Sequence, residues 1–149
     1  MPKLDLTFPA GALSDAAKRE LPTQLAAALL RWEGAPDTEF FRAITWAHVH
    51  ELPAEAVFTA DGQAELSHFV VDVTVPQGAL SDRRKGGLVE ETSKLVRQAA
   101  GLADEDGVRV WVLIHEVPEG NWGAAGQIVR FEQLRAAAKA EREKAEAPA

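Results

Sequence analysis

The chain has 149 residues and a formal net charge of −7, from 16 Lys and Arg against 23 Asp and Glu. It has no Cys and no Tyr, which excludes disulfides, thiolate nucleophiles, Cys-based metal sites and a phenol as general acid. Its acidic balance argues against a nucleic-acid partner, and no apolar run reaches the roughly 20 residues that span a bilayer. We therefore expect one soluble, cytoplasmic domain that has no membrane contact and no secretory leader.

The chain contains an internal repeat. The segment Leu6–Asp15, LTFPAGALSD, returns almost unchanged as Val73–Asp82, VTVPQGALSD. A Trp followed by the order His-Glu-apolar-Pro closes each copy, at Trp46 with His50–Pro53 and at Trp111 with His115–Pro118. Because residue type, order and spacing agree, we interpret the chain as two copies of one supersecondary unit.

The first copy begins with alternating apolar and polar residues over Lys3–Phe8, which predicts a half-buried strand. Ser14 is a natural N-cap for a helix that Gly34 ends. Pro22 either kinks this helix or delays its start. The apolar stripe of the helix consists of Leu21, Leu25, Ala28 and Leu29. A second strand is predicted at about 41–50.

The second copy repeats this order. Phe69–Val75 is mostly apolar and β-branched, which predicts a more deeply buried strand. Ser81 and Gly101 mark the start and end of its helix, and a strand follows at about 108–116. The helix stripe here is Leu88, Thr92, Leu95 and Ala99.

A strand, a helix and a strand form a β-α-β unit, whose two strands are parallel. We therefore predict an α/β (α+β) fold, in which two units build a four-stranded, mostly parallel sheet with both helices on one face. The domain would span 1–131, with units at about 2–53 and 69–126. Residues 54–68 would form a hairpin or an extended connection, and 132–149 a charged tail that is helical or disordered.

The opposite face of this sheet has no predicted cover, and an uncovered apolar face favours a homo-oligomer. Its exposed residues in the first unit depend on the parity of the strand. They are either Ile44, Trp46 and His48, or Ala43, Thr45, Ala47 and Val49.

Pro2 follows the single methionine of the chain. Methionine aminopeptidases remove Met before small residues, so we expect a mature protein with a free proline amine. In an apolar pocket, desolvation would lower the pKa of this amine toward neutrality and make it an effective general base. The simpler alternative is that Pro2 only protects the terminus.

Three features together resemble the tautomerase superfamily: Pro2 before an alternating strand, the two-unit organisation, and the segment Glu116–Gly126. This segment, EVPEGNWGAAG, looks like the closing hairpin of 4-oxalocrotonate tautomerase, and the length and Glu51–Phe58 look more like the cis-3-chloroacrylic acid dehalogenase branch. The resemblance covers residues 1 to about 130. It implies a tautomerase/MIF-like fold, a homotrimer, a catalytic Pro2, and Trp122 as an apolar wall of the pocket.

The chain departs from this branch at five polar positions. By the resemblance, Leu29 stands in place of a helix His, Pro76 and Ala79 in place of two loop Arg, Leu113 in place of a Tyr, and Ala124 in place of a Glu. We therefore expect no dehalogenase or hydratase activity, because no group remains to activate water. The first four of these residues are expected to line an apolar substrate pocket.

A carboxylate substrate needs a cation. Arg109, at the start of the final predicted strand, is the first candidate, and Asn121 is expected to hydrogen-bond an enolate oxygen. The other candidate cations are Arg42, Arg83 and Arg84.

No metal and no other cofactor is expected. His48, His50 and His115 could suggest a metal site, but the sequence gives them no clear carboxylate partner. A structural role at the strand ends is the simpler interpretation for His50 and His115, which occupy matching places in the two copies.

The leading hypothesis is a homotrimeric tautomerase that binds a small molecule and uses Pro2 as general base. It would interconvert the keto and enol forms of a 2-keto acid such as phenylpyruvate. The alternative is a non-catalytic member of the same fold that binds a small molecule or has a structural role. A third possibility is a dedicated isomerase or cyclisation step in a biosynthetic pathway.

Overall fold

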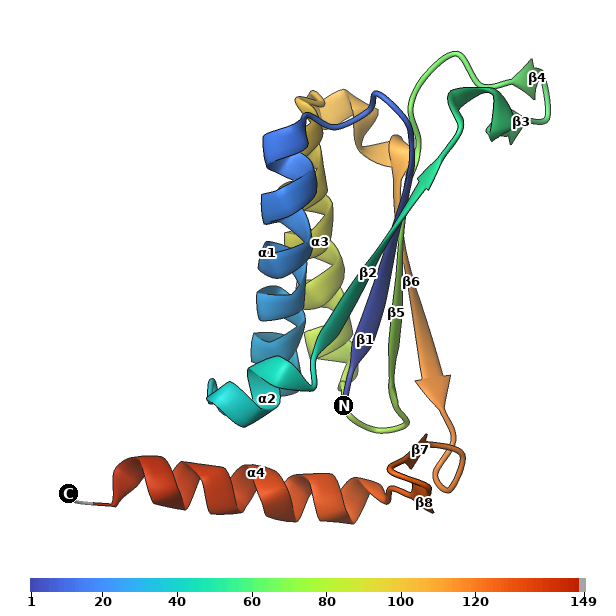
Figure 1. The fold of residues 1–149 in the computed structure, drawn as a ribbon. Coiled ribbons are helices and arrows are strands. Elements are labelled where there is room, and N and C mark those ends of the chain that lie inside the picture. Colours follow the sequence, from blue (N-terminus) through green and yellow to red (C-terminus); the bar gives the residue numbers. More distant parts are fainter. Residues whose placement is uncertain (148–149) are drawn as a thin grey trace.

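The computed structural model describes residues 1–147 and has a four-stranded sheet with two long helices on one face (Figure 1). The strands are β1 (Lys3–Pro9), β2 (Trp46–Leu52), β5 (Phe69–Pro76) and β6 (Val110–Val117), in the order β2-β1-β5-β6. Within each unit the two strands are parallel, and β1 and β5 join the units in an antiparallel pair. The predicted sheet of two β-α-β units is confirmed.

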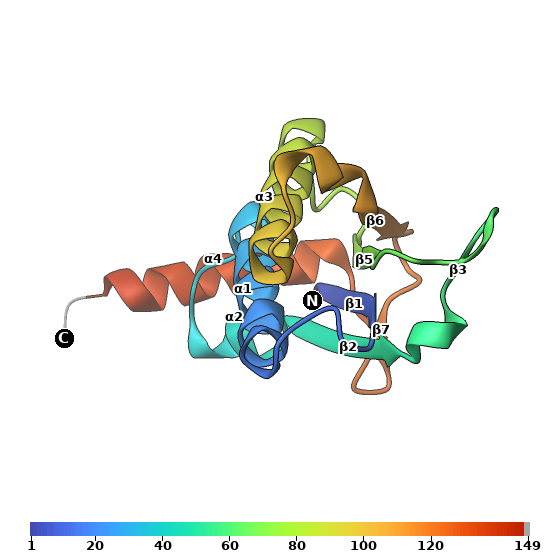
Figure 2. The same ribbon diagram turned by 90° about the horizontal axis from the view of Figure 1, so that it is seen from above.

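The two long helices are α1 (Asp15–Glu33) and α3 (Asp82–Ala100), which lie side by side over the sheet (Figure 2). Their predicted caps are present: Ser14 Oγ accepts from the amide of Ala17 at 3.1 Å, and Ser81 Oγ accepts from that of Arg84 at 3.4 Å. Gly34 and Gly101 end the helices with φ of +73° and +65°, a conformation that favours glycine. Pro22 lies inside α1 and does not delay its start.

The core lies between the helices and the inner face of the sheet. Alternate residues of β1 and β5 point inward, as the period of a strand requires. They meet the apolar stripes of the two helices, and Leu29 of the predicted α1 stripe is 0% exposed. In α3 the predicted stripe was partly wrong, because Val96 is 0% exposed, whereas Leu95 and Ala99 are only partly buried. The central strands are thus buried on the helix side in both units.

Two predicted strands begin later than expected. In the first unit, Glu39–Ala43 form the short helix α2, because the Thr38 side chain caps it and Phe41 packs into the interior. In the second unit, Asp104–Arg109 form a 3₁₀ helix, so the strand starts at Val110. Arg109 is therefore the last residue of that turn and does not belong to the strand.

The remaining elements connect and extend the units. A 3₁₀ turn (Ala54–Ala56) and a small hairpin of β3 (Phe58–Thr59) and β4 (Gly62–Gln63) occupy the connector. After β6, a hairpin of β7 (Gly123–Ala124) and β8 (Gln127–Ile128) leads into the helix α4 (Phe131–Glu146).

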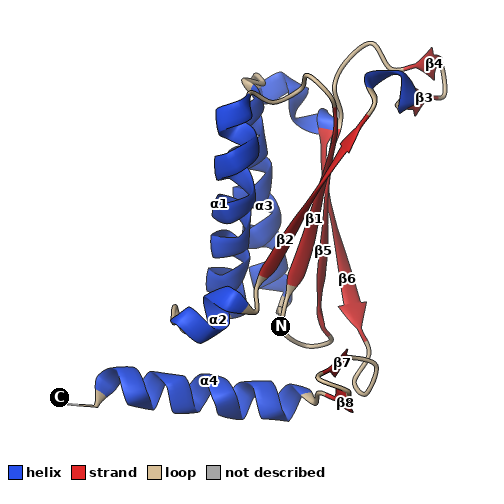
Figure 3. Ribbon diagram, viewed as in Figure 1, coloured by secondary structure: helices blue, strands red, loops and turns tan. Residues whose placement is uncertain are grey.

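Helix α4 runs crosswise past the end of the molecule where α1 ends and the chain begins (Figure 3). Phe131 packs against the core, and Arg142 donates a hydrogen bond to the carbonyl of Gly34. None of the described helices is long and apolar enough to cross a bilayer.

The uncovered face of the sheet presents Trp46, His48 and His50 from β2. Of the two predicted sets of exposed residues, the one that contains Trp46 and His48 is therefore found on this face. Trp46 and Trp111 are 57% and 61% exposed there. Between them lie two matching pairs, with His50 Nε2 at 2.7 Å from Asp5 Oδ1 and His115 Nε2 at 2.8 Å from Asp72 Oδ1. These histidines thus have carboxylate partners that the sequence did not indicate, and no group of three metal-binding side chains occurs in residues 1–147.

Two adjacent glycines of α3 provide a test of the helix packing. A Cβ added at Gly87 would lie 2.1 Å from the Trp32 ring, whereas one at Gly86 would meet nothing within 4 Å. We expect Gly87→Ala to lower the free energy of unfolding by about 1–3 kcal/mol through overpacking. Gly86→Ala should raise it by about 0.5–1 kcal/mol through better helix propensity. Urea unfolding of both variants measures the difference, and equal stability would contradict the close packing of α1 against α3.

Candidate active site

Pro2 lies buried just before β1. Its carbonyl accepts from the amide of Trp46 at 3.1 Å, which extends the pairing of β1 with β2. Lys3 pairs with Thr74 on the other side, so the amino terminus lies beside the end of β5. The terminus is therefore fixed by the two neighbouring strands of the sheet.

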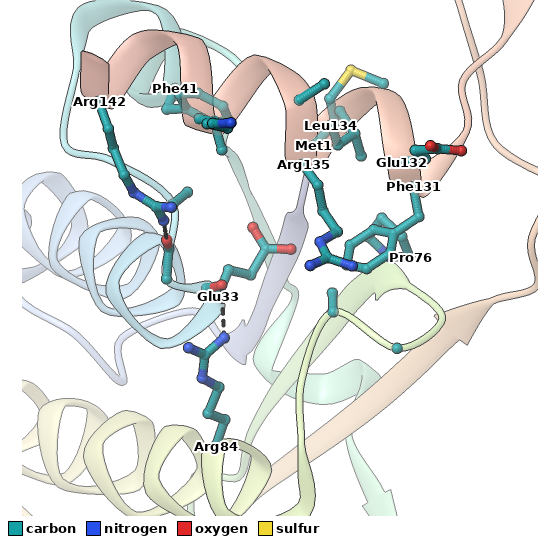
Figure 4. A pocket seen from close by; sticks show the side chains of 17 residues that line it. Met1, Glu33, Phe41, Pro76, Arg84, Phe131, Glu132, Leu134, Arg135 and Arg142 are labelled. Atoms are coloured by element: carbon teal, nitrogen blue, oxygen red, sulfur yellow. Dashed lines mark hydrogen bonds between the residues drawn. The ribbon is translucent and has the colours of Figure 1, made fainter.

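A cavity of about 720 Å³ opens at this end of the sheet (Figure 4). It collects segments that are distant in the sequence: the amino terminus, the end of α1, the loop after β5, the start of α3 and one side of α4. The residues that matter for its chemistry are Met1, Glu33, Pro76, Ala79, Arg84, Phe131, Leu134, Arg135, Lys139 and Arg142. Only in the tertiary structure do these side chains share one space.

Two groups in this cavity have shifted pKa values. Burial lowers the pKa of the terminal ammonium, and the nearby Glu33 carboxylate opposes this shift. Burial raises the pKa of Glu33 to about 7, and the terminal ammonium opposes that shift in turn. Glu33 is therefore able to gain or lose a proton near neutral pH, and the lowered pKa of the amine increases its unprotonated fraction. Both properties favour acid–base catalysis.

Two of the cations at the cavity hold the end of α1. Arg84 donates to the Glu33 carbonyl at 3.0 Å, and Arg142 donates to the carbonyl of Gly34. These last carbonyls of a helix have no partner within the helix and carry partial negative charge. Both arginines therefore contribute mainly to the position of the backbone next to Glu33.

Arg135 has a different arrangement. Its guanidinium points from α4 into the space between Glu33 and Pro76 (Figure 4). Within residues 1–147 it makes no hydrogen bond and no ion pair, whereas Lys139 lies 3.7 Å from Glu143. Arg135 is therefore available to an anion in the cavity.

The structure brings only some of the sequence-predicted residues together. Pro76 and Ala79 line the cavity beside the amino terminus. Leu29 is instead part of the hydrophobic core, and Leu113 lies on the uncovered face of the sheet, 42% exposed. The position of Leu29 follows from the stripe that packs α1 onto the sheet.

The other predicted residues also lie apart from Pro2 within one chain. Arg109 is at the opposite end of the sheet, where it donates to the Ser67 carbonyl at 2.8 Å and lies 3.4 Å from Asp106. Asn121 and Trp122 stand in the turn before β7 and do not line the cavity. Their expected contacts with substrate would require a neighbouring subunit.

Sequence reasoning missed Glu33 and Arg135. Glu33 is the last residue of α1 and belongs to no motif. Arg135 lies in the segment for which the sequence predicts a charged tail. Phe131 and Leu134 in the same segment nevertheless indicate, by their spacing, that a helix there has one apolar side. That spacing was the available signal that α4 packs on the domain.

Comparison with known proteins identifies the fold. Residues 70–132 match the family model Tautomerase, described as a tautomerase enzyme. No curated protein sequence gives a significant match.

Three solved structures serve as examples of chains whose fold is similar to that of this chain. A fused 4-OT in a symmetric trimer is 25% identical, with 85% of this chain and 94% of that chain covered and a TM-score of 0.70. Pt0534 inactivated by 2-oxo-3-pentynoate is 23% identical, with coverage of 89% and 98% and a TM-score of 0.73. N1, of the cis-3-chloroacrylic acid dehalogenase family, is 20% identical, with coverage of 98% and 92% and a TM-score of 0.71.

Proposed function

We propose that the chain is a fused two-unit member of the tautomerase superfamily and a keto–enol tautomerase with Pro2 as its general base. Its substrate would be a 2-keto acid such as phenylpyruvate. The observation that carries this proposal is the amino terminus itself, which lies in a cavity of about 720 Å³ with an amine whose pKa is lowered by burial.

Removal of Met1 would transfer the free amine to Pro2 and enlarge the space next to it, because Met1 lines the cavity. The neutral amine would take a proton from the substrate, and the resulting ammonium would return a proton to carbon. A lowered amine pKa favours this role, since a useful fraction of the amine is then unprotonated at neutral pH.

A 2-keto acid also needs a cation for its carboxylate. Arg135 supports this part of the proposal, because it points into the cavity and has no protein partner among the described residues. Pro76, Ala79 and Phe131 would offer apolar surface to the rest of the substrate. The site thus combines the guanidinium of Arg135 and an apolar wall beside the amine.

We also propose a closed homotrimer. The solved fused 4-OT chains include a symmetric and an asymmetric trimer, and this chain exposes Trp46 and Trp111 on its uncovered sheet face. Within such an assembly, Asn121, Trp122 and Arg109 would serve a neighbouring subunit's site. Leu113, on the same uncovered face, would lie in or near the interface.

The test of the proposed function has two stages. The intact mass of the purified protein should lack Met1, and the protein should accelerate the ketonisation of phenylpyruvate enol, followed by ultraviolet absorbance. If Met1 is retained, the Pro2 nitrogen stays in a peptide bond and cannot act as a base, which would overturn the proposal. A processed protein that binds phenylpyruvate without turning it over would be the non-catalytic member of the fold.

Arg135 gives a more specific prediction. We expect Arg135→Ala to raise KM for phenylpyruvate about 10-fold or more, because a hydrogen bond to a charged group contributes about 1.5–3 kcal/mol. Steady-state kinetics should show a smaller effect on kcat. Lys144→Ala is the control on the same helix, since Lys144 pairs with Glu141 and does not line the cavity. Equal KM values for both variants would exclude Arg135 as the carboxylate ligand.

A further inference from the structure

Glu33 is an acidic residue of the cavity that the proposed base mechanism does not use. Glu33 ends α1 and extends its carboxylate into the cavity, across from Pro76 and Arg135 (Figure 4). Its two oxygens accept no hydrogen bond and form no ion pair within residues 1–147, although three arginines lie around the same cavity. A partly buried carboxylate that protein partners leave available is able to serve a ligand.

The position of Glu33 is fixed through its backbone. Arg84 from α3 and Arg142 from α4 hold two successive carbonyls, those of Glu33 and Gly34. The neighbouring Trp32 is fixed as well, because its Nε1 donates to Glu91 at 2.7 Å. Three contacts from other elements therefore restrict the segment that aims the carboxylate, as a site for proton transfer requires.

Glu33 also shares its space with the amino terminus. Met1 and Glu33 line the same cavity, and the charge of each opposes the effect of burial on the pKa of the other. Burial raises the pKa of Glu33 to about 7 and lowers the pKa of the amine, and both shifts favour proton exchange between the site and a ligand. The remaining charged groups at the cavity are Arg84, Glu132, Arg135, Lys139 and Arg142.

We propose that Glu33 is the second proton-transfer group of the site and exchanges a proton with the C2 oxygen of the 2-keto acid. This inference rests on the proposed function, because it assigns the partner of Pro2 in the same reaction. Glu33 would thus provide a polar group for proton transfer, although the positions Leu29, Leu113 and Ala124, where the resemblance expects such groups, are apolar.

In enolisation, the neutral Pro2 amine takes the C3 proton as general base, and the Glu33 carboxylic acid gives its proton to the C2 oxygen. Ketonisation is the reverse of these steps, and its proton balance closes with the same two groups. The Glu33 carboxylate takes the proton of the enol O–H, and the O–H electron pair forms the C=O bond. The C=C electron pair then takes a proton from the Pro2 ammonium, which forms the C3–H bond. The site now holds a carboxylic acid and a neutral amine, and transfer of one proton from Glu33 to Pro2 restores it.

The test compares Glu33→Gln with Glu20→Gln. The amide of the first variant would keep the size of the side chain and its ability to hydrogen-bond a ligand, but it cannot transfer a proton. Glu20 is an exposed residue of the same helix. We expect Glu33→Gln to lower kcat for phenylpyruvate ketonisation about 100-fold, with little change in KM, since general acid–base catalysis contributes about 10²–10⁴. The limb of the pH–kcat profile near the Glu33 pKa of about 7 should also disappear. Glu20→Gln should behave as wild type.

A second measurement does not depend on turnover. The pH dependence of alkylation of the Pro2 amine reports the amine pKa, and Glu33→Gln should lower this pKa because it removes the opposing negative charge. An unchanged amine pKa would overturn the inference. So would a Glu33→Gln enzyme that keeps wild-type kcat, or one that loses kcat but retains the same pH limb. Those outcomes leave the proposed function intact if Pro2→Ala is inactive, whereas a wild-type protein without turnover overturns the proposed function itself.

Discussion

Replacement of Pro2 by alanine should lower kcat/KM for phenylpyruvate ketonisation by about 100-fold or more, the lower range of a general base's contribution. Alanine is also small, so Met1 should still be removed and the variant should present a free amine at the same place. What changes is the amine itself, which becomes primary and loses the ring that restricts its orientation. The measurement is steady-state kinetics together with the intact mass of the variant.

A second variant separates the proline from its free amine. A Gly-Ser dipeptide added before Pro2 keeps the residue and the start of β1 but converts the amine into an amide. If Pro2 is the base, this protein should lose as much activity as Pro2→Ala, while its circular dichroism stays that of the parent. An extended protein with wild-type turnover, or a Pro2→Ala enzyme with unchanged rates, would exclude the amine as the base.

Replacement of Leu29 by alanine should lower the free energy of unfolding by about 2–5 kcal/mol, the usual cost of a buried Leu→Ala change. Leu29 is 0% exposed and packs in the core between α1 and the sheet. The loss comes from apolar surface returned to water and from the cavity that remains. Urea unfolding followed by circular dichroism measures it.

Leu66 provides the matched control. It lies in the connector and is 59% exposed, so Leu66→Ala should change stability by no more than about 0.5 kcal/mol. The pair also distinguishes two roles for Leu29. The resemblance to the dehalogenase branch placed this residue in the substrate pocket, and the structure places it in the core. A Leu29→Ala protein of normal stability but raised KM would favour the pocket.

Assembly has consequences for the whole site. Glu33, Arg135 and the amino terminus come together within one chain. Asn121, Trp122 and Arg109 do not reach them there, so any part that these three residues have in catalysis depends on a second subunit. A substitution at Glu33 or Arg135 therefore tests a site formed by a single chain. A substitution at Asn121, Trp122 or Arg109 tests a contribution that needs the oligomer.

The sequence by itself determined the elements and their order. The alternation in Lys3–Phe8, the caps Ser14 and Ser81 and the repeated segments predicted two β-α-β units, and the structure confirms them. Such patterns succeed because strand period and capping depend on residues only a few positions apart. The predicted start of β2 was wrong. Phe41 is a residue type that suits a strand, but the Thr38 cap and packing into the core place it in the helix α2.

Tertiary structure alone decided which side chains surround the amino terminus. Glu33 and Arg135 are far apart in the chain and meet because α4 crosses the end of α1, where Arg142 binds the Gly34 carbonyl. Packing also decides the position of Leu29, which lies in the core because the apolar stripe of α1 is buried against the sheet. The spacing of Phe131 and Leu134 indicates that α4 has an apolar side, but it does not indicate where that side packs. The place depends on how whole elements pack, and the chemistry proposed for this protein arises at that level.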